Sequence, residues 1–215
     1  MQNLKLNNKS LVLYAITDRT WLNGKTLPEI VEEAILGGVT FIQLREKNLC
    51  LEEFLKTAKE VKKVTDKYNI PFVINDNVDI AVLVNADGVH IGQSDEEIIT
   101  ARQKLGYDKI IGLSAKTVAE AVKAEQNGAD YIGVGAVFNT STKLDADSVS
   151  IETLRNICKS VNVPVVAIGG ITKDNVLELT GTDISGISVI SAIFAQDNIR
   201  NAASELIKLT KKIIE

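Results

Sequence analysis

The sequence is poor in the residues that cross-link small proteins or bind metals through sulfur. It contains two cysteines, Cys50 and Cys158, and one histidine among its 215 residues, and the cysteines form no CxxC pair. This spacing indicates neither a disulfide framework nor a zinc site. We expect both cysteines to be ordinary packing residues, because a free cysteine behaves as a small apolar side chain.

Long apolar runs and an excess of positive charge are also missing. No run of about 18 apolar residues occurs, and the N-terminal MQNLKLNNKS lacks the apolar centre of a secretory signal. The 24 basic and 28 acidic residues give a net charge of −4, so there is no electrostatic basis for binding nucleic acid or a membrane surface. We therefore expect a cytoplasmic protein with small-molecule partners. The sequence does not set the oligomeric state, and a homo-oligomer is compatible with it.

Common nucleotide-binding and nucleophile motifs are absent as well. GVGAVF at 133–138 is not a dinucleotide fingerprint, since Phe138 stands where GxGxxG requires its last glycine, and no Walker motif occurs. No convincing Ser-His-Asp or Cys-His set is present either. The sequence therefore does not indicate chemistry through an activated nucleophile.

The chain does contain a regular alternation of short β-branched runs and helical patterns. Eight strands are predicted, at residues 11–17, 41–46, 72–75, 88–92, 109–114, 131–137, 165–170 and 186–191. Helical spacing of apolar residues follows, most clearly at 28–38, 51–68, 117–129, 150–161 and 198–214. Pro28 suits a first helical turn, Ser150 suits a helix cap with Thr153 following, and Gly37, Gly38 and Gly128 fall where helices end.

This order predicts an α/β protein that forms a single domain over residues 1–215, a (β/α)8 TIM barrel of parallel strands. A doubly wound open sheet has the same local alternation and is the alternative. Eight strands in a chain of 45% hydrophobic residues, without a change of composition that would mark a second domain, favour the closed barrel.

The second predicted strand continues into a line of polar residues. Ile42 and Leu44 suit the outward face beneath the helices, so Gln43, Arg45 and Lys47 face the barrel axis and approach its C-terminal mouth. The alternative is that Arg45 and Lys47 lie beyond the strand in a solvated loop. Polar residues recur at the ends of other strands, which favours the mouth: Thr17, Asp18, Asn75, Asp76, His90, Gln93, Asp95 and Ser114. Glu46 points outward by the same alternation, unless the strand ends before it.

Two carboxylates follow neighbouring strands. Asp76 ends the third predicted strand and Asp95 follows the fourth, and neighbouring strands are about 4.8 Å apart. Together with Arg45 and Lys47 they suggest Mg²⁺ with a diphosphate, because Mg²⁺ is typically held by one or two carboxylates and by substrate phosphate oxygens. The alternative for Asp95, which precedes Glu96 and Glu97, is a helix cap.

A second anion site is predicted at the ends of the last two strands. Gly169-Gly170 and Ile190-Ser191 stand where many barrels bind a phosphate through backbone N–H groups. The polar segment at 138–147 contains Thr140, Ser141, Thr142 and Lys143, and it suits either a loop that closes over phosphates or a plain surface loop.

Motifs along most of the chain resemble one family. They are YAITD at 14, QLREK at 43, INDN at 74, ADGVHIGQSD at 86, the strand with Ser114, GADYIGVGAVFNTSTK at 128, VPVVAIGGI at 163 and ISVISAI at 187. They occur in the order of the thiamine-phosphate synthase family and cover the chain from Leu11 to about Ala195. The resemblance implies a TIM barrel enzyme that joins the pyrimidine and thiazole halves of thiamine.

The resemblance also implies roles for individual residues. The site for hydroxymethylpyrimidine diphosphate is matched by Gln43, Leu44, Arg45, Glu46, Lys47, Asn75, Ser114 and Lys143, and the Mg²⁺ ligands by Asp76 and Asp95. The site for the thiazole phosphate is matched by Thr140, Ser141, Thr142, Gly170, Ile190 and Ser191. Catalytic roles fall to Arg45, Lys47, Ser114 and Lys143.

The implied reaction is a dissociative substitution. The pyrimidine methylene carbon loses pyrophosphate, the electron-rich aminopyrimidine stabilises the resulting carbocation, and the thiazole nitrogen attacks it. That nitrogen carries no proton, so we interpret His90 as a positional residue rather than a general base. Trp21, Tyr131 and Phe138 suit either a ring substrate or the core.

Three other functions fit a phosphate-binding barrel. A related thiazole tautomerase is expected to carry a histidine where this chain has Ser114, and to lack part of the Mg²⁺ and diphosphate set. A sugar-phosphate isomerase or epimerase would require a catalytic base at the mouth, and no candidate stands out. A phosphate-sensing barrel without catalysis would have no reason to keep two carboxylates beside a basic line.

Overall fold

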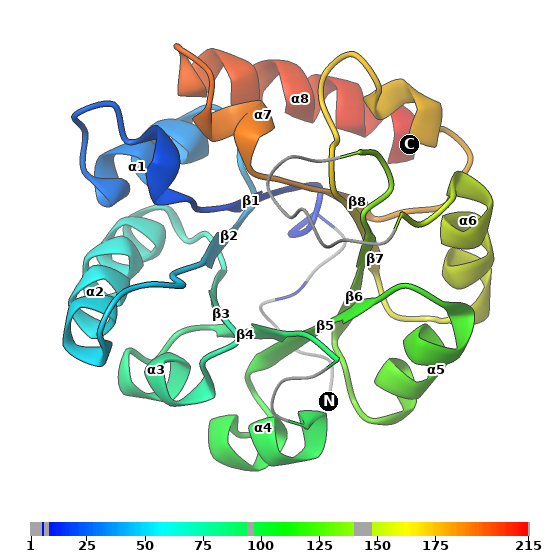
Figure 1. The fold of residues 1–215 in the computed structure, drawn as a ribbon, viewed down its shortest axis with the longest axis horizontal. Coiled ribbons are helices and arrows are strands. Elements are labelled where there is room, and N and C mark those ends of the chain that lie inside the picture. The colour runs from blue at the N-terminus through cyan, green and yellow to red at the C-terminus, as the bar shows by residue number, and fades with distance from the viewer. Residues whose placement is uncertain (1–5, 7–8, 94–96, 140–147, 215) are drawn as a thin grey trace.

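The fold is a closed barrel of eight parallel strands in sequence order (Figure 1). This computed structural model describes residue 6 and residues 9–93, 97–139 and 148–214. The strands are β1 (Leu13–Ile16), β2 (Phe41–Leu44), β3 (Phe72–Asn75), β4 (Gly88–Ile91), β5 (Ile110–Ala115), β6 (Tyr131–Gly135), β7 (Val165–Ile168) and β8 (Gly186–Val189). β8 pairs with β1, Ser188 opposite Tyr14, and this pairing closes the sheet. The predicted barrel is confirmed, and the open doubly wound sheet is excluded.

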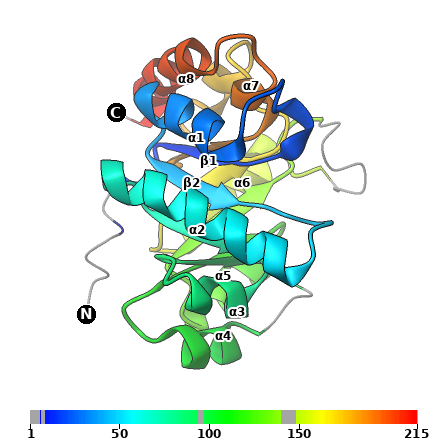
Figure 2. The ribbon, with the colours of Figure 1, turned by 90° about the vertical axis from the view of Figure 1, so that its left-hand side faces the viewer.

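Helices surround the strands on the outside of the ring (Figure 1). They are α1 (Leu27–Leu36), α2 (Leu51–Tyr68), α3 (Val78–Leu83), α4 (Ile98–Leu105), α5 (Val118–Gln126), α6 (Ile151–Ser160), α7 (Ser191–Phe194) and α8 (Ile199–Ile214), with 3-10 turns η1 (Arg19–Trp21) and η2 (Val176–Leu179). The side view shows α1 and α2 lying across β1 and β2 (Figure 2). The repeat is less regular than predicted, because η2 replaces an α-helix after β7 and the short α7 precedes α8.

Helix ends follow the predicted chemistry. Pro28 lies in the first turn of α1. The Ser150 hydroxyl accepts a hydrogen bond from the Thr153 N–H at 3.0 Å and caps α6. Gly128 has φ +94°, which lies in the left-handed region that favours glycine. None of the described helices has both the length and the apolar character that crossing a bilayer requires.

The prediction for the two cysteines is half right. Cys158 on α6 packs against the core, and burial, reinforced by the nearby Asp183, raises the pKa of its thiol to about 12. Cys50 is exposed, because it is the N-cap residue of α2 and lies in the loop that enters the helix. Its description as a packing residue is therefore wrong.

The two faces of the strands carry two separate sets of side chains. Ile42 and Leu44 of β2 belong to the large core between sheet and helices, as predicted. The barrel interior is filled by a smaller cluster that includes Tyr14, Phe41 and Tyr131. These three rings pack edge to face, with centroids 4.6 to 5.9 Å apart. Aromatic rings from β1, β2 and β6 therefore fill the space beneath the mouth.

Glycine provides the space that the largest interior ring needs. A Cβ atom at Gly112 on β5 would lie 2.1 Å from Cζ of Tyr131 and 2.4 Å from its hydroxyl oxygen. Those distances are far inside van der Waals contact, and the surrounding rings leave Tyr131 little room to move. Gly112 is therefore required by the packing of Tyr131 rather than by its own backbone conformation.

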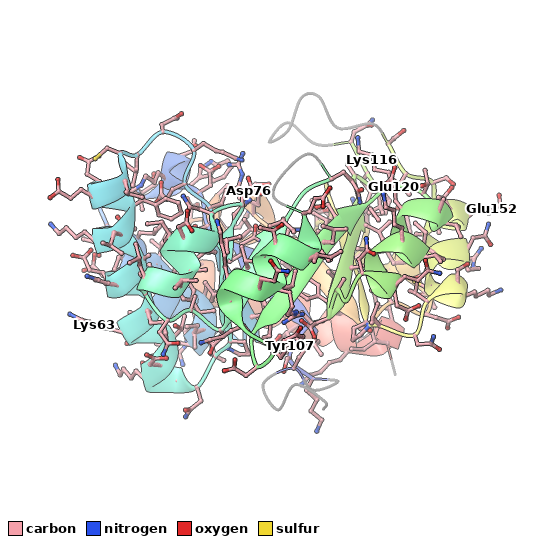
Figure 3. All side chains as sticks on the ribbon, turned by 90° about the horizontal axis from the view of Figure 1, so that it is seen from below. Lys63, Asp76, Tyr107, Lys116, Glu120 and Glu152 are labelled. Atoms are coloured by element: carbon pink, nitrogen blue, oxygen red, sulfur yellow. The ribbon has the colours of Figure 1, made fainter. Side chains whose placement is uncertain are left out.

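We expect Gly112→Ala to destabilise the barrel by about 1–3 kcal/mol, the usual cost of overpacking a filled core. Urea unfolding followed by circular dichroism measures this as a lower midpoint at unchanged slope. Lys63→Ala is the control, because Lys63 lies exposed on the outer face of α2 (Figure 3). Equal midpoints for the two variants would show that the barrel interior accommodates a methyl group beside Tyr131, against this packing argument.

Candidate active site

Polar side chains gather at the end of the barrel where the strands finish. Figure 3 shows Asp76, which directly follows β3, at this end of the molecule, and Tyr107, which precedes β5, at the opposite end. Parallel strands bring their carboxyl ends to the same rim, so the residues after β1, β2, β3 and β5 surround one mouth. The prediction that the polar strand ends share one location is confirmed.

Only the first residue of the predicted polar line, Gln43, lies within β2. Gln43 is 2% exposed, and its Nε2 donates a hydrogen bond to the hydroxyl oxygen of Tyr14 inside the barrel. β2 ends at Leu44, so Arg45 and Lys47 belong to the following loop. The predicted strand at 41–46 is therefore two residues too long, and the alternation used to place Arg45 and Lys47 does not extend to them. The alternative, a solvated loop, describes their position but not their contacts, because Arg45 lies beside Asp18 and Lys47 pairs with Asp76.

Arg45 is fixed at the mouth by β1 and by the residues after it. Its backbone N–H donates to Oγ1 of Thr17 at 3.1 Å, and its Nη1 lies 3.6 Å from Oδ2 of Asp18. The side chain is 18% exposed, and its Nε is buried with no hydrogen-bond partner among the described residues. An unsatisfied buried donor is costly, so an acceptor brought beside Arg45 would remove that cost.

Lys47 and Asp76 form an ion pair across the ends of β2 and β3. Nζ of Lys47 lies 2.5 Å from Oδ2 of Asp76, and the side chains are 50% and 30% exposed. Asp76 has φ +62°, an uncommon conformation for a residue other than glycine. Its N–H donates to the carbonyl of His90 at 2.8 Å, which holds that conformation and ties β3 to β4. The Asp76 carboxylate is therefore held at the mouth and remains accessible.

Asp76 is suited to act as a Mg²⁺ ligand. It offers a hard oxygen donor at an accessible position, and Mg²⁺ often takes only one or two protein carboxylates and completes its shell with water and substrate phosphate. Asp95 lies outside the described residues, so its part in the metal site stays a prediction. Within 6, 9–93, 97–139 and 148–214, no group of three or more His, Cys, Asp and Glu side chains gathers as a metal cluster.

Glu46 has a structural partner. Arg19 donates through Nε to both carboxylate oxygens of Glu46, at 2.8 and 2.9 Å, and through Nη2 to Oγ1 of Thr57 on α2 at 2.9 Å. The Glu46 side chain is 4% exposed and is connected through Arg19 to α2 on the outside of the barrel. The Leu44 side chain also points outward, into the helix-facing core. Both residues were predicted to bind the diphosphate, and the structure leaves only their backbone for that role.

Ser114 and Asn75 lie at the rim on either side of β4. The Ser114 hydroxyl is 3.0 Å from Nε2 of His90, and its carbonyl accepts from Nε2 of Gln93 at 2.7 Å. Asn75 is paired with His90 across β3 and β4 and is half-buried. The rim of the mouth therefore carries the Asn75 amide at the end of β3 and the Ser114 hydroxyl at the end of β5, next to the basic loop after β2.

Sequence reasoning missed Tyr14 and left Tyr131 undecided. Both rings lie in the barrel interior, and their hydroxyls are 2.9 Å apart. Tyr131 is also 2.9 Å from Nδ1 of His90. Tyr14 lies two residues before Ile16 on the inward face of β1, so the alternation of that strand could have identified it as an interior residue.

The predicted phosphate site after β7 and β8 has a tightly fitted glycine. Gly170 has φ +64°, and a Cβ atom there would lie 2.3 Å from the carbonyl oxygen of Asn139. Its own carbonyl accepts from Nδ2 of Asn175 at 2.9 Å. Ile190 is the N-cap residue of α7, and Ser191 begins that helix. Thr140, Ser141, Thr142 and Lys143 lie outside the described residues, so their contacts stay predictions.

Comparison with known proteins identifies the family. The model of the family described as thiamine monophosphate synthase matches residues 13–193. The chain is 53% identical to a thiamine-phosphate synthase of Clostridium tetani, covering 94% of this chain and 97% of the relative. It is 51% identical to that of Clostridium acetobutylicum, covering 96% and 98%.

A solved structure agrees with the sequence relatives. Thiamine phosphate pyrophosphorylase from Pyrococcus furiosus superposes with a TM-score of 0.89 at 42% identity, covering 97% of this chain and 99% of that one. The matched region includes all eight strands and the rim residues described above. The chain therefore belongs to the thiamine monophosphate synthase family.

Proposed function

We propose that this enzyme joins 4-amino-2-methyl-5-(diphosphooxymethyl)pyrimidine to the thiazole phosphate, giving thiamine phosphate and pyrophosphate. The observation that carries the proposal is the set of charges at the mouth, formed by Arg45, Lys47 and Asp76. Arg45 has a buried N–H with no partner among the described residues, and Lys47 has the accessible Asp76 carboxylate as its partner. Such a set suits a diphosphate accompanied by a divalent cation.

The residues of the mouth favour departure of pyrophosphate over attack by a protein nucleophile. Negative charge grows on the leaving oxygen as the bond between carbon and oxygen breaks, and fixed cations stabilise that charge. Arg45 and Lys47 would bind the phosphates from the β2 side, and Lys143 would add a third cation. Mg²⁺ held by Asp76 and Asp95 would supply further charge neutralisation when bound.

The thiazole phosphate is assigned to the other side of the mouth. Gly170, Ile190 and Ser191 follow β7 and β8, where barrels commonly bind phosphate through backbone N–H groups. Thr140, Ser141 and Thr142 would contribute hydroxyls to the same phosphate. The two phosphorylated substrates would then approach each other over the barrel axis, with the basic loop after β2 on one side and the glycine turn after β7 on the other.

We expect Ser191→Ala to raise KM for the thiazole phosphate about tenfold, because the variant removes one hydrogen bond to a charged group. KM for the pyrimidine diphosphate should stay at the wild-type value. Steady-state kinetics with each substrate varied in turn measures both constants. A change in KM for the pyrimidine diphosphate alone would show that the assignment of Ser191 to the thiazole phosphate site is wrong.

One experiment separates the synthase from a thiazole tautomerase. The enzyme is incubated with Mg²⁺ and the thiazole phosphate, first alone and then together with the pyrimidine diphosphate. Thiamine phosphate should form only in the complete mixture, and the thiazole should be recovered unchanged from the incomplete one. Isomerisation of the thiazole without condensation would overturn the proposal. We propose that this chemistry takes place in the cytoplasm, since both substrates are small charged molecules.

A further inference from the structure

Five side chains from five strands form one continuous hydrogen-bonded chain through the barrel interior. Gln43 donates to Tyr14, the Tyr14 and Tyr131 hydroxyls are 2.9 Å apart, and Tyr131 is 2.9 Å from Nδ1 of His90. Nε2 of His90 is 3.0 Å from Oγ of Ser114. This series of hydrogen bonds begins and ends at two residues of the mouth, Gln43 and Ser114, and two of its inner members, Tyr14 and Tyr131, have no assigned role.

The interior is shaped around these groups. Tyr14 and Tyr131 are fully buried, Gln43 is 2% exposed and His90 is 6% exposed. Gly112 makes room for Tyr131, and Gly133 makes room for Ile168 and His90: a Cβ atom at Gly133 would lie 2.6 Å from Cδ1 of Ile168 and 3.1 Å from Cε1 of the imidazole. With so little free space, neither the tyrosine rings nor the imidazole can turn to other partners.

The order of donors and acceptors follows from simple counting. The amide nitrogen Nε2 of Gln43 has no lone pair to offer, so the Tyr14 oxygen must be the acceptor. A buried hydroxyl proton requires an acceptor, and among the described residues the remaining partner of Tyr14 is the Tyr131 oxygen. Tyr131 must therefore direct its own proton to Nδ1 of His90.

Burial keeps both phenol protons in place. Desolvation raises the pKa of the Tyr14 and Tyr131 hydroxyls well above the ordinary value for tyrosine. Each phenol thus supplies one proton to the chain at neutral pH. With Nδ1 of His90 accepting, a neutral imidazole carries its proton on Nε2 and donates it to Oγ of Ser114.

We propose that Tyr14, Tyr131 and His90 are positioning residues that fix the donor and acceptor pattern presented to the pyrimidine substrate. Gln43 is held with its carbonyl oxygen free to accept, and Ser114 is held with its hydroxyl proton free to donate. An aminopyrimidine offers the matching groups, an exocyclic amino donor and ring nitrogen acceptors. The identity of this ligand rests on the proposed function, whereas the proton positions rest on the interior contacts alone.

This arrangement gives the single histidine a defined task. Both ring nitrogens of His90 are engaged, Nδ1 by Tyr131 and Nε2 by Ser114, so the imidazole does not act as a free base. It instead transmits the orientation set by the tyrosines to Ser114. The proposed reaction needs no proton removed from the attacking nitrogen, which agrees with this role.

The tautomer of His90 is directly measurable, because the sequence contains one histidine. Protein without a histidine tag and with ¹⁵N-labelled histidine is studied without substrate by long-range ¹H–¹⁵N correlation spectroscopy near pH 7. In the neutral ring the proton is expected on Nε2, with an unprotonated Nδ1. A neutral ring protonated at Nδ1 would overturn the proposal, and this result does not depend on whether the enzyme condenses thiamine precursors.

Tyr131→Phe tests the functional half of the proposal, because it removes one hydroxyl and keeps the ring. We expect kcat/KM for the pyrimidine diphosphate to fall about tenfold, with KM for the thiazole phosphate unchanged. Adding Tyr14→Phe should cause little further loss, since the chain is already interrupted. Tyr68→Phe is the control for loss of a hydrogen-bonded tyrosine hydroxyl, because the Tyr68 hydroxyl donates to Glu32 at 2.8 Å but lies on α2 outside the barrel.

Two kinetic results would count against the positioning role. One is a Tyr131→Phe enzyme as active as Tyr68→Phe, and the other is two independent losses that multiply in the double variant. If the wild-type enzyme shows the expected tautomer but makes no thiamine phosphate, the proposed function fails while the proton order stands. The wild-type spectrum also keeps the proposal testable if Tyr131→Phe does not fold.

Discussion

Arg45→Ala is expected to lower kcat/KM for the pyrimidine diphosphate by about 10²–10³-fold, the usual effect of removing a donor aimed at developing charge. The guanidinium of Arg45 lies beside Asp18, and the backbone N–H of Arg45 donates to Thr17. The side chain is therefore already oriented at the mouth. Its Nε is a buried donor with no partner among the described residues. Steady-state kinetics with the pyrimidine diphosphate varied measures the loss.

Two further variants decide whether charge or geometry is responsible. Arg45→Lys restores the charge but not the planar fork of donors, so it should recover only a part of the lost activity. Arg200→Ala removes an exposed arginine on α8 and should leave the rate unchanged. If Arg45→Ala retained the activity of Arg200→Ala, Arg45 would not contact the leaving group.

Asp76→Asn is expected to lower kcat about 100-fold and to raise the Mg²⁺ concentration needed for half-maximal rate at least tenfold. Asparagine keeps the size of the side chain and one oxygen donor, so its left-handed backbone conformation, φ +62°, remains accessible. The negative charge is lost, and with it both the ion pair to Lys47 and the best ligand for a hard cation. A Mg²⁺ titration of the initial rate provides both numbers.

Asp79→Asn is the matched control for this variant. Asp79 lies three residues further along, in the first turn of α3, and also pairs with a lysine, Lys104, at 3.2 Å. Its side chain is 73% exposed and pairs with α4 rather than with Lys47, so the substitution should change neither kcat nor the Mg²⁺ dependence. Identical Mg²⁺ titrations for Asp76→Asn and the wild type would remove Asp76 from the metal site.

Local sequence pattern predicted the barrel well because its strands alternate strictly. The outward Ile42 and Leu44 and the inward Gln43 follow directly from that alternation, and α2 has the predicted bounds, Leu51–Tyr68. The pattern does not reveal where a strand stops. β2 ends at Leu44, so the positions of Arg45 and Lys47 depend on Asp18 and Asp76, which are 27 and 29 residues away in the chain.

Contacts between residues that are far apart in the chain could not be predicted from the sequence. The pairing of Glu46 with Arg19 brings together the loops after β1 and β2. The chain from Gln43 to Ser114 depends on two glycines, Gly112 and Gly133, that give no signal of their own in one sequence. The 3-10 turn η2 stands where the alternation of strand and helix predicts an α-helix, and the hydroxyls of Thr180 and Thr182 donate to the carbonyls of Leu177 and Leu179 at its end.

The central claim is that this barrel condenses two phosphorylated precursors with loss of pyrophosphate. The most direct test incubates the purified enzyme with the pyrimidine diphosphate, the thiazole phosphate and Mg²⁺, and quantifies both products over time. Thiamine phosphate and pyrophosphate should accumulate in a 1:1 ratio, and neither should form at a comparable rate when the pyrimidine diphosphate is omitted. A folded, Mg²⁺-supplied enzyme that forms no thiamine phosphate would contradict the account.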